Sequence, residues 1–147
     1  MLYAKKSLGQ NFLSDLNITR KILNLTQIEK KNILEIGPGK GALTEEILKL
    51  KPKSLILIEK DNSLAKELKL KFYKNKTIKI YNRDFLDFEF ENVIKNKTII
   101  FGNLPYNIST QILTQWIVDQ QQFKSIKKLI LMFQKEVANR IISEFNN

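Results

Sequence analysis

Two motifs in the first half of the sequence could bind a small ligand. The run Gly37-Pro38-Gly39-Lys40-Gly41 follows an apolar stretch, and glycines at such a turn let the backbone bend tightly and approach a ligand closely. This spacing is neither the G-x-G-x-x-G of dinucleotide sites nor a phosphate loop. Glu59 follows at roughly the 20-residue spacing from which an acidic side chain accepts hydrogen bonds from ribose hydroxyls. A structural turn, and a surface carboxylate paired with Lys60, are the alternatives.

Two further motifs could hold the amino group of a nucleobase. Asp84 follows another apolar stretch and can accept from the exocyclic amine of an adenine, or it can cap the next turn. Asn103 and Leu104 offer an amide oxygen and a backbone carbonyl as two acceptors, Pro105 fixes the backbone, and Tyr106 offers a flat face. Such a set suits an amino group on a stacked base. A proline turn beside a core tyrosine is the alternative.

These motifs sit at the ends of predicted strands. Apolar runs alternate with amphipathic helical patterns, which indicates an α/β fold with a mostly parallel sheet covered by helices on both faces. Because such sheets bind ligands at the carboxyl ends of their strands, we expect the motifs to meet at one edge. The predicted strands cover residues 32–37, 54–59, 77–82, 98–102 and 128–133, and the predicted helices cover residues 15–27, 41–50, 62–73, 109–118 and 135–145.

Composition narrows the class of protein. The 147 residues are 43% hydrophobic and 27% charged, which is typical of one globular domain. The sequence has no Cys and no His, which excludes disulfides, Cys-based zinc sites and imidazole catalysis, and we expect no metal. A net charge of +10 favours a polyanionic partner, nucleic acid before membrane, although lysines can also be merely solvated. No apolar run is long enough to span a membrane, so we expect a cytoplasmic protein.

Over essentially its whole length the chain resembles the class I, S-adenosylmethionine-dependent rRNA adenine dimethyltransferase family. The combination of Gln10-Asn11-Phe12-Leu13 with Asn103-Leu104-Pro105-Tyr106 is highly specific, whereas each glycine motif alone is not. The stretches that match the family in order are Lys6–Leu13, Leu34–Thr44, Ile58–Asp61, Arg83–Phe85, Asn103–Thr110 and Phe133–Arg140.

The resemblance implies a Rossmann-like methyltransferase fold, S-adenosyl-L-methionine as cofactor, and a role for each motif. Glu59 would hold the cofactor's ribose, Asp84 its adenine amine, and Asn103 would stand between cofactor and target base. The cofactor-binding residues implied are Asn11, Leu13, Gly37, Gly39, Glu59, Asp84 and Asn103, and the catalytic residues implied are Asn103, Leu104, Pro105 and Tyr106.

Two branches of the family differ in substrate. Pro38, Leu104, Asn107 and the run from Gln134 resemble the KsgA type, which dimethylates adjacent adenosines in a 3′-terminal hairpin of small-subunit rRNA. The partner implied is the pre-ribosomal small subunit, bound by a monomer. The alternatives are the Erm type, which acts on large-subunit rRNA, and a non-catalytic member that binds RNA or DNA. A nicotinamide-dependent dehydrogenase is disfavoured by the glycine spacing.

Members of the family carry segments that this sequence does not. They have further strands, a second aromatic motif and a small C-terminal helical domain. We therefore expect residues 1–147 to form the methyltransferase domain without the C-terminal part of its sheet, and with an unpaired edge on the fifth strand. RNA contacts are expected from the basic surface, with Lys5, Lys6, Lys135 and Arg140 as candidates.

Overall fold

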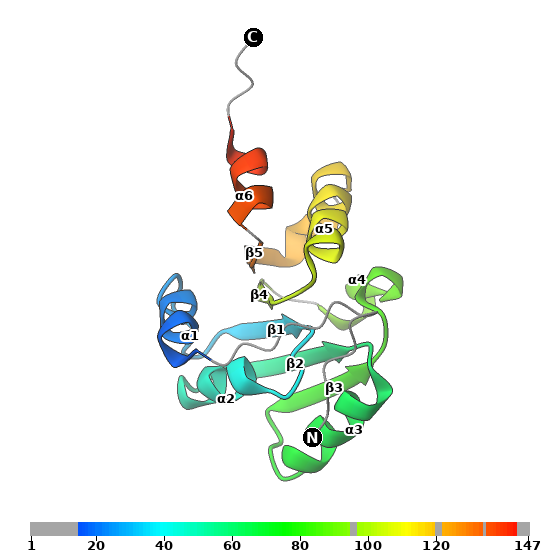
Figure 1. Ribbon diagram of the computed structural model, residues 1–147. Coiled ribbons are helices and arrows are strands. Elements are labelled where there is room, and N and C mark those ends of the chain that lie inside the picture. The colour runs from blue at the N-terminus through cyan, green and yellow to red at the C-terminus, as the bar shows by residue number, and fades with distance from the viewer. Residues whose placement is uncertain (1–14, 95–96, 120–121, 134, 144–147) are drawn as a thin grey trace.

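The structure is a computed structural model that describes residues 15–94, 97–119, 122–133 and 135–143. Within these residues, strands and helices alternate along the chain (Figure 1). No described helix is both long and apolar enough to cross a bilayer. The elements are α1 (Leu16–Leu23), β1 (Asn32–Ile36), α2 (Ala42–Lys49), β2 (Ser54–Glu59), α3 (Asn62–Lys71), β3 (Ile78–Asn82), the 3₁₀ helix η2 (Phe85–Asp87), α4 (Phe90–Val93), β4 (Thr98–Gly102), α5 (Tyr106–Val118), the 3₁₀ helix η3 (Gln122–Ser125), β5 (Ile126–Leu131) and α6 (Lys135–Ile142).

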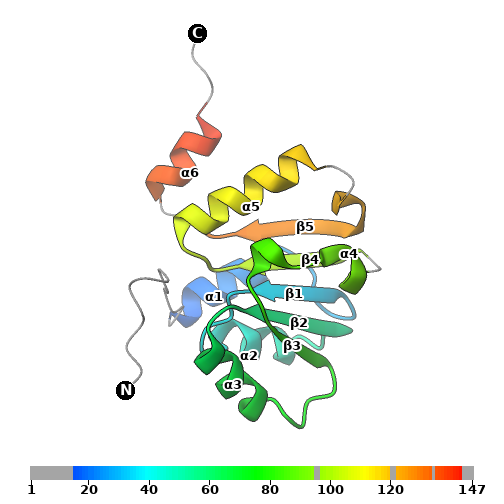
Figure 2. The ribbon, with the colours of Figure 1, turned by 90° about the vertical axis from the view of Figure 1, so that its right-hand side faces the viewer.

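The strands form one parallel sheet in the order β3-β2-β1-β4-β5 (Figure 2). The chain builds outward from β1 through β2 to β3, and then returns to the other side of β1 with β4. The carboxyl ends of β1 and β4 therefore flank the point where the strand order reverses, which is where open α/β sheets bind ligands. The predicted parallel α/β fold is confirmed.

Helices cover both faces of the sheet. Successive residues of a strand point to opposite faces, so neighbouring residues of β1 pack in different core clusters. In β1, Ile33 packs in a core cluster with side chains of α1, α2 and α3. Its neighbour Leu34 packs in a second cluster with Phe85 of η2 and side chains of α5. Both β1 side chains are fully buried, so the end of this strand gives the site a rigid base.

The first predicted helix starts where expected and ends early. Asp15 accepts hydrogen bonds from the amides of Asn17 and Ile18, at 2.8 and 3.4 Å, and is therefore the N-cap that its residue type predicts. The helix ends at Leu23 rather than at residue 27. Leu25, which the periodicity assigns to the apolar face, is 58% exposed, so no core contact extends the helix.

The predicted start of the helix that corresponds to α5 is wrong. The helix expected over residues 109–118 begins at Tyr106. Proline is favoured at helix starts, and the Pro105 carbonyl accepts from the amides of Ile108 and Ser109 at 3.0 Å each. The Asn-Leu-Pro-Tyr motif thus joins the end of β4 to α5 through a connection of only three residues, Asn103, Leu104 and Pro105.

The fifth strand lies two residues earlier than predicted. It covers Ile126–Leu131 rather than 128–133, because the strand already includes the exposed Lys127 and Lys128, which interrupt the apolar run. Ile126 and Lys128 pair with Thr98 and Ile99 of β4, and the register shifts between these two pairs. A backbone ladder does not depend on the polarity of the side chains that it carries. Among the described residues, β5 pairs with β4 alone.

Candidate functional site

The turn after β1 brings the glycine-rich run against the end of β4. Gly37 has a φ of +65°, in the left-handed region that favours glycine, and its amide donates to the Ile58 carbonyl of β2 at 2.9 Å. A Cβ atom at Gly37 would lie 2.6 Å from Cδ2 of Leu104 and 3.6 Å from the backbone oxygen of Asn103. The two motifs that the sequence singles out therefore lie side by side at the switch point of the sheet.

Glu59 ties the end of β2 to the same turn. Its side chain is buried, with 6% exposed, and its two carboxylate oxygens accept from the amides of Gly39 at 3.1 Å and Asp61 at 2.8 Å. Burial raises the pKa of Glu59, and the backbone hydrogen bonds from Asp61 and Gly39 partly oppose that rise. The alternative of a surface carboxylate paired with Lys60 is wrong, since Glu59 is buried and Lys60 pairs elsewhere.

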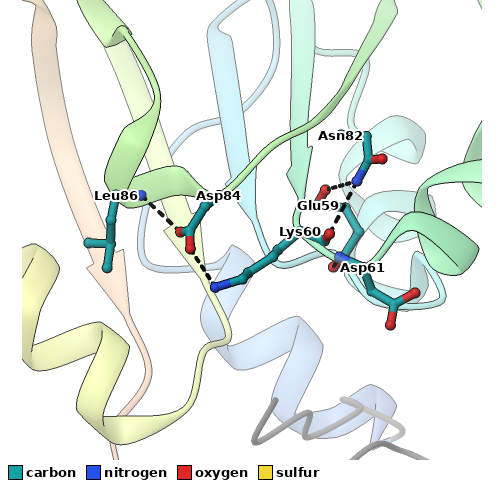
Figure 3. A network of polar contacts seen from close by, with 6 residues as sticks. All are labelled: Glu59, Lys60, Asp61, Asn82, Asp84 and Leu86. Atoms are coloured by element: carbon teal, nitrogen blue, oxygen red, sulfur yellow. Dashed lines mark hydrogen bonds and ion pairs between the residues drawn. The ribbon is translucent and has the colours of Figure 1, made fainter. Parts of the chain in front are cut away.

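Asp84 and Lys60 form an ion pair between the ends of β2 and β3 (Figure 3). Asp84 Oδ2 accepts from Lys60 Nζ at 2.5 Å, and Oδ1 accepts from the amide of Leu86 at 3.1 Å. The second bond makes Asp84 the cap of η2, so the capping alternative is confirmed. Its predicted contact with an adenine amine stays a prediction.

The ionisation of Asp84 reflects the same contacts. Partial burial raises the pKa of the Asp84 carboxyl. The hydrogen bonds from Lys60 and the Leu86 amide, with the charge of Lys60, outweigh burial and hold that pKa below its ordinary value. Asn82 fixes the neighbouring backbone, because its amide nitrogen donates to the carbonyls of Glu59 at 2.9 Å and Lys60 at 3.2 Å (Figure 3). Asp84 is thus an ionised acceptor at neutral pH.

The end of β4 carries the two predicted acceptors. Asn103 and Leu104 are partly buried, and Pro105, with a φ of −51°, is the N-cap of α5. Tyr106 is the first residue of that helix, and its side chain lies outside what the structure describes, so its predicted stacking role stays a prediction.

Contacts with β5 hold this segment in place. The buried Ser109 of α5 donates its hydroxyl to the Met132 carbonyl at 3.3 Å. The Met132 amide in turn donates to the Gly102 carbonyl, at the end of β4, at 3.0 Å. The backbone on either side of the Asn-Leu-Pro-Tyr motif is therefore anchored to the next strand.

Glu35 is a buried carboxyl group that the sequence motifs do not single out. It is 2% exposed in β1 and accepts a hydrogen bond from the hydroxyl of Thr44 in α2 at 2.6 Å. Burial raises the pKa of Glu35 to about 7; the Thr44 hydrogen bond opposes this rise and the nearby charge of Glu59 adds to it. The available signal is an acidic residue between the apolar Leu34 and Ile36, in the strand that precedes the glycine run.

The buried carboxyl groups of Glu35 and Glu59 lie near the glycine turn, and burial raises the pKa of both. In their ionised form they favour a ligand with a positive charge and disfavour a phosphate. Among the described residues there is no group of three or more acidic side chains placed to hold a metal ion.

The predicted residues Asn11 and Leu13 lie outside the described residues. The predicted residues that the structure gathers at the carboxyl edge of the sheet are Gly37, Gly39, Glu59, Asp84, Asn103, Leu104 and Pro105.

The strand order, with a glycine turn after β1 and acidic residues at the ends of β2 and β3, is that of a Rossmann-like α/β fold, and the solved structures that resemble it include rRNA methyltransferases. The chain is similar to the crystal structure of a dimethyladenosine transferase from Plasmodium falciparum, with a TM-score of 0.76 and 28% identity over 93% of this chain and 48% of that one. It is also similar to the 23S rRNA methyltransferase ErmE, with a TM-score of 0.74 and 28% identity over 88% of this chain and 50% of that one.

Residues 1–147 match the family model described as ribosomal RNA adenine dimethylase, and the chain belongs to that family. It is 55% identical over 144 residues to a "Ribosomal RNA small subunit methyltransferase A" of Pelagibacter ubique, covering 98% of this chain and 54% of that protein. A protein of the same name from a Wolbachia of Drosophila simulans is 44% identical over 150 residues, covering 100% of this chain and 54% of that protein. The chain thus spans about half the length of these relatives.

Proposed function

We propose that the protein is an S-adenosylmethionine-dependent methyltransferase that dimethylates the exocyclic amine of adenosines in small-subunit rRNA. The observation that carries this proposal is the close approach of Gly37 to Asn103 and Leu104, which sets a cofactor turn beside two acceptors for an amino group. Family membership and relatives named as small-subunit rRNA methyltransferases support it. The enzyme would act on the pre-ribosomal small subunit as a cytoplasmic monomer.

The side chains at the carboxyl edge fit the proposed cofactor. A carboxylate offers about four acceptor positions, so Glu59 keeps capacity for ribose hydroxyls beside the amides of Gly39 and Asp61. Asp84 is the proposed acceptor for the adenine amine. A positive ligand such as a sulfonium cation favours the ionised form of the buried Glu35 and Glu59, whose pKa values burial raises, whereas the pyrophosphate of a dinucleotide disfavours it. When bound, S-adenosylmethionine supplies an electrophilic methyl group.

Asn103 and Leu104 would activate the target nitrogen by orienting it. The lone pair of an adenine amine is delocalised into the ring, which makes the nitrogen a poor nucleophile. Hydrogen bonds from its two N–H groups to the Asn103 amide oxygen and the Leu104 carbonyl would favour a pyramidal nitrogen whose lone pair points toward the methyl group. The in-line positioning of nitrogen and methyl group contributes roughly 7–11 kcal/mol in intramolecular analogues. Pro105 fixes the carbonyl, and Tyr106 would stack on the extruded base.

The same scheme needs no side-chain base. After methyl transfer the nitrogen carries four substituents and a positive charge, and this ammonium group loses a proton readily to water. The sequence has no His and no Cys, which agrees with chemistry that depends on positioning rather than on proton abstraction.

The test combines Asn103→Ala with binding and methyl-transfer assays. We expect Asn103→Ala to lower methyl transfer to unmethylated small subunits by about 100-fold or more, the scale seen when one oriented hydrogen bond is removed. Calorimetric titration should show nearly unchanged S-adenosylmethionine affinity. Asn24→Ala, an exposed asparagine at the C-cap of α1, is the matched control and should leave both unchanged.

Three results would count against the proposal. Equal loss of binding and transfer in Asn103→Ala would remove the catalytic assignment of that residue. Transfer to large subunits instead of small ones would favour the Erm-type substrate, which the 28% identity to ErmE supports less than the 55% identity to a small-subunit enzyme does. RNA binding by the unaltered protein without any transfer would favour the non-catalytic alternative.

A further inference from the structure

The opposite edge of the sheet, where the strands begin, carries an ordered array of lysines. The register of the ladders aligns the residue directly before β1, β2 and β4 with the residue two before β3. All of these aligned residues are lysines, and their order across the sheet is Lys76, Lys53, Lys31 and Lys97. We call these four residues the lysine row. The amide of Lys53 donates to the carbonyl of Lys31 at 2.8 Å, so pairing continues past the start of the strands.

The lysine row concentrates positive charge that the described residues do not neutralise. Neighbouring strands lie about 4.8 Å apart, so four lysines share an edge about 14 Å long. Like charges opposite one another on adjacent strands are destabilising. Three of the side chains are exposed and that of Lys31 is partly exposed, and none forms an ion pair within the part of the chain that the structure describes. A bound polyanion would therefore reduce the repulsion between the lysines of the row.

Two further lysines at this edge occupy backbone conformations that lysine adopts reluctantly. Lys30 and Lys51 have φ values of +56° and +52°, and no other non-glycine residue in the described ranges has a positive φ. Glycine and asparagine adopt this region most readily. The amide of Lys30 donates to the carbonyl of Lys51 at 3.0 Å, which joins the two turns. The contact of Lys30 with Glu29 is long, at 4.0 Å, and both side chains are exposed.

The residues that follow the lysine row are polar. The next register position holds Asn32, Ser54, Thr77 and Thr98, and the Ser54 hydroxyl donates to the Asn32 side-chain oxygen at 2.9 Å. Membrane-binding surfaces combine basic residues with an apolar face that inserts into the bilayer. A line of lysines backed by polar residues instead resembles surfaces that contact phosphate groups, where Lys, Ser, Thr and Asn side chains supply the hydrogen bonds.

We propose that the lysine row, with Lys30 and Lys51, is a second contact surface for the phosphate backbone of duplex RNA, on the edge of the sheet opposite the candidate site. A linear array of cations suits a linear polyanion, and phosphate contacts fix orientation without reading sequence. The inference rests on the proposed function only for the source of the RNA.

The test measures how binding of a short labelled RNA duplex, without target adenosines, depends on salt. In the intact protein, the four substitutions Lys31→Gln, Lys53→Gln, Lys76→Gln and Lys97→Gln should reduce the slope of log affinity against log salt by about three, at roughly 0.7–0.9 for each phosphate that the variant no longer neutralises. Thermal stability should stay the same or rise, because like-charge repulsion is relieved. The matched control neutralises exposed lysines of α1, α3 and β3, namely Lys21, Lys66, Lys69 and Lys79.

Each outcome bears on the proposal. A smaller slope for the row variant but not for the control supports it. An equal change in both sets overturns it, because net charge alone then explains the slope, and an unchanged slope overturns it because the row then contacts no phosphates. Loss of binding to anionic phosphatidylserine vesicles with unchanged RNA binding would assign the row to membranes instead. Lys51→Gly should raise the thermal midpoint while it lowers RNA affinity, and a fall in both would contradict the account. If the proposed function is wrong, the unaltered protein should show no methyl transfer, while the difference in slope between the row variant and the control variant remains.

Discussion

The substitution Glu35→Gln tests the electrostatics of the site. The Glu35 carboxyl group is fully buried in β1, and its pKa is raised to about 7 from an ordinary value of 4.5. Between these two values the folded protein binds more protons than the unfolded chain does, so the free energy of unfolding falls as the pH rises. The stabilising contribution is complete below pH 4.5 and is lost by the time the pH has passed through 7.

The size of this effect follows from the shift. A shift of one pKa unit corresponds to about 1.4 kcal/mol, so the rise to about 7 amounts to roughly 3 kcal/mol. Glutamine is neutral at every pH, has nearly the shape of glutamate, and keeps an oxygen that accepts from the Thr44 hydroxyl. We therefore expect Glu35→Gln to match the unaltered protein near pH 4.5 and to be more stable by about 3 kcal/mol at about pH 8.

The assay is urea unfolding at a series of pH values. Glu67→Gln makes the same chemical change on α3, where the side chain is partly exposed, and serves as the control. A stability difference between Glu35→Gln and the unaltered protein that stays constant with pH, or a loss of stability at all pH values, would refute the assignment of a raised pKa. The substitution should also weaken S-adenosylmethionine binding at about pH 8, because it removes a negative charge beside the proposed sulfonium site. Greater stability together with weaker cofactor binding is the expected signature.

Two further substitutions test the geometry of the edge. Gly37→Ala should lower the free energy of unfolding by about 1–2 kcal/mol, because φ is +65° there and the new Cβ would meet Leu104; urea unfolding measures this, and an unchanged midpoint would contradict the close approach. Lys60→Met should raise the pKa of Asp84 toward its ordinary value, with little change in stability because Lys60 is exposed. An NMR titration of Asp84 reports it, and an unmoved pKa would mean that the ion pair is absent in solution.

Much of the fold follows from local sequence patterns. The apolar runs and the helical periodicity predict every strand and the longer helices, because burial on both faces of a parallel sheet demands nearly continuous apolar strands. The errors fall where another effect competes with periodicity. Pro105 moves the start of α5 to Tyr106, and two exposed lysines conceal the start of β5.

The sequence predicts the positions of the candidate site residues but not the contacts between them. Glycines after one strand and acidic residues after the next two are local features, so the positions of Gly37, Glu59 and Asp84 could be predicted. The partners of these residues could not be predicted. That Glu59 holds the Gly39 amide, and that Asp84 pairs with Lys60, depends on which strands lie next to one another.

The order of residues along the chain is enough to establish the alternation of strands and helices, the residues at the strand ends and the resemblance to a family. Three features depend instead on the folded arrangement: the raised pKa of Glu35, the contact of Gly37 with Leu104, and the alignment of the lysine row. The difference arises because periodicity and turn chemistry act between neighbours in the chain. Burial, register and electrostatic coupling act between strands that are distant in sequence, and they exist only once the order β3-β2-β1-β4-β5 is formed.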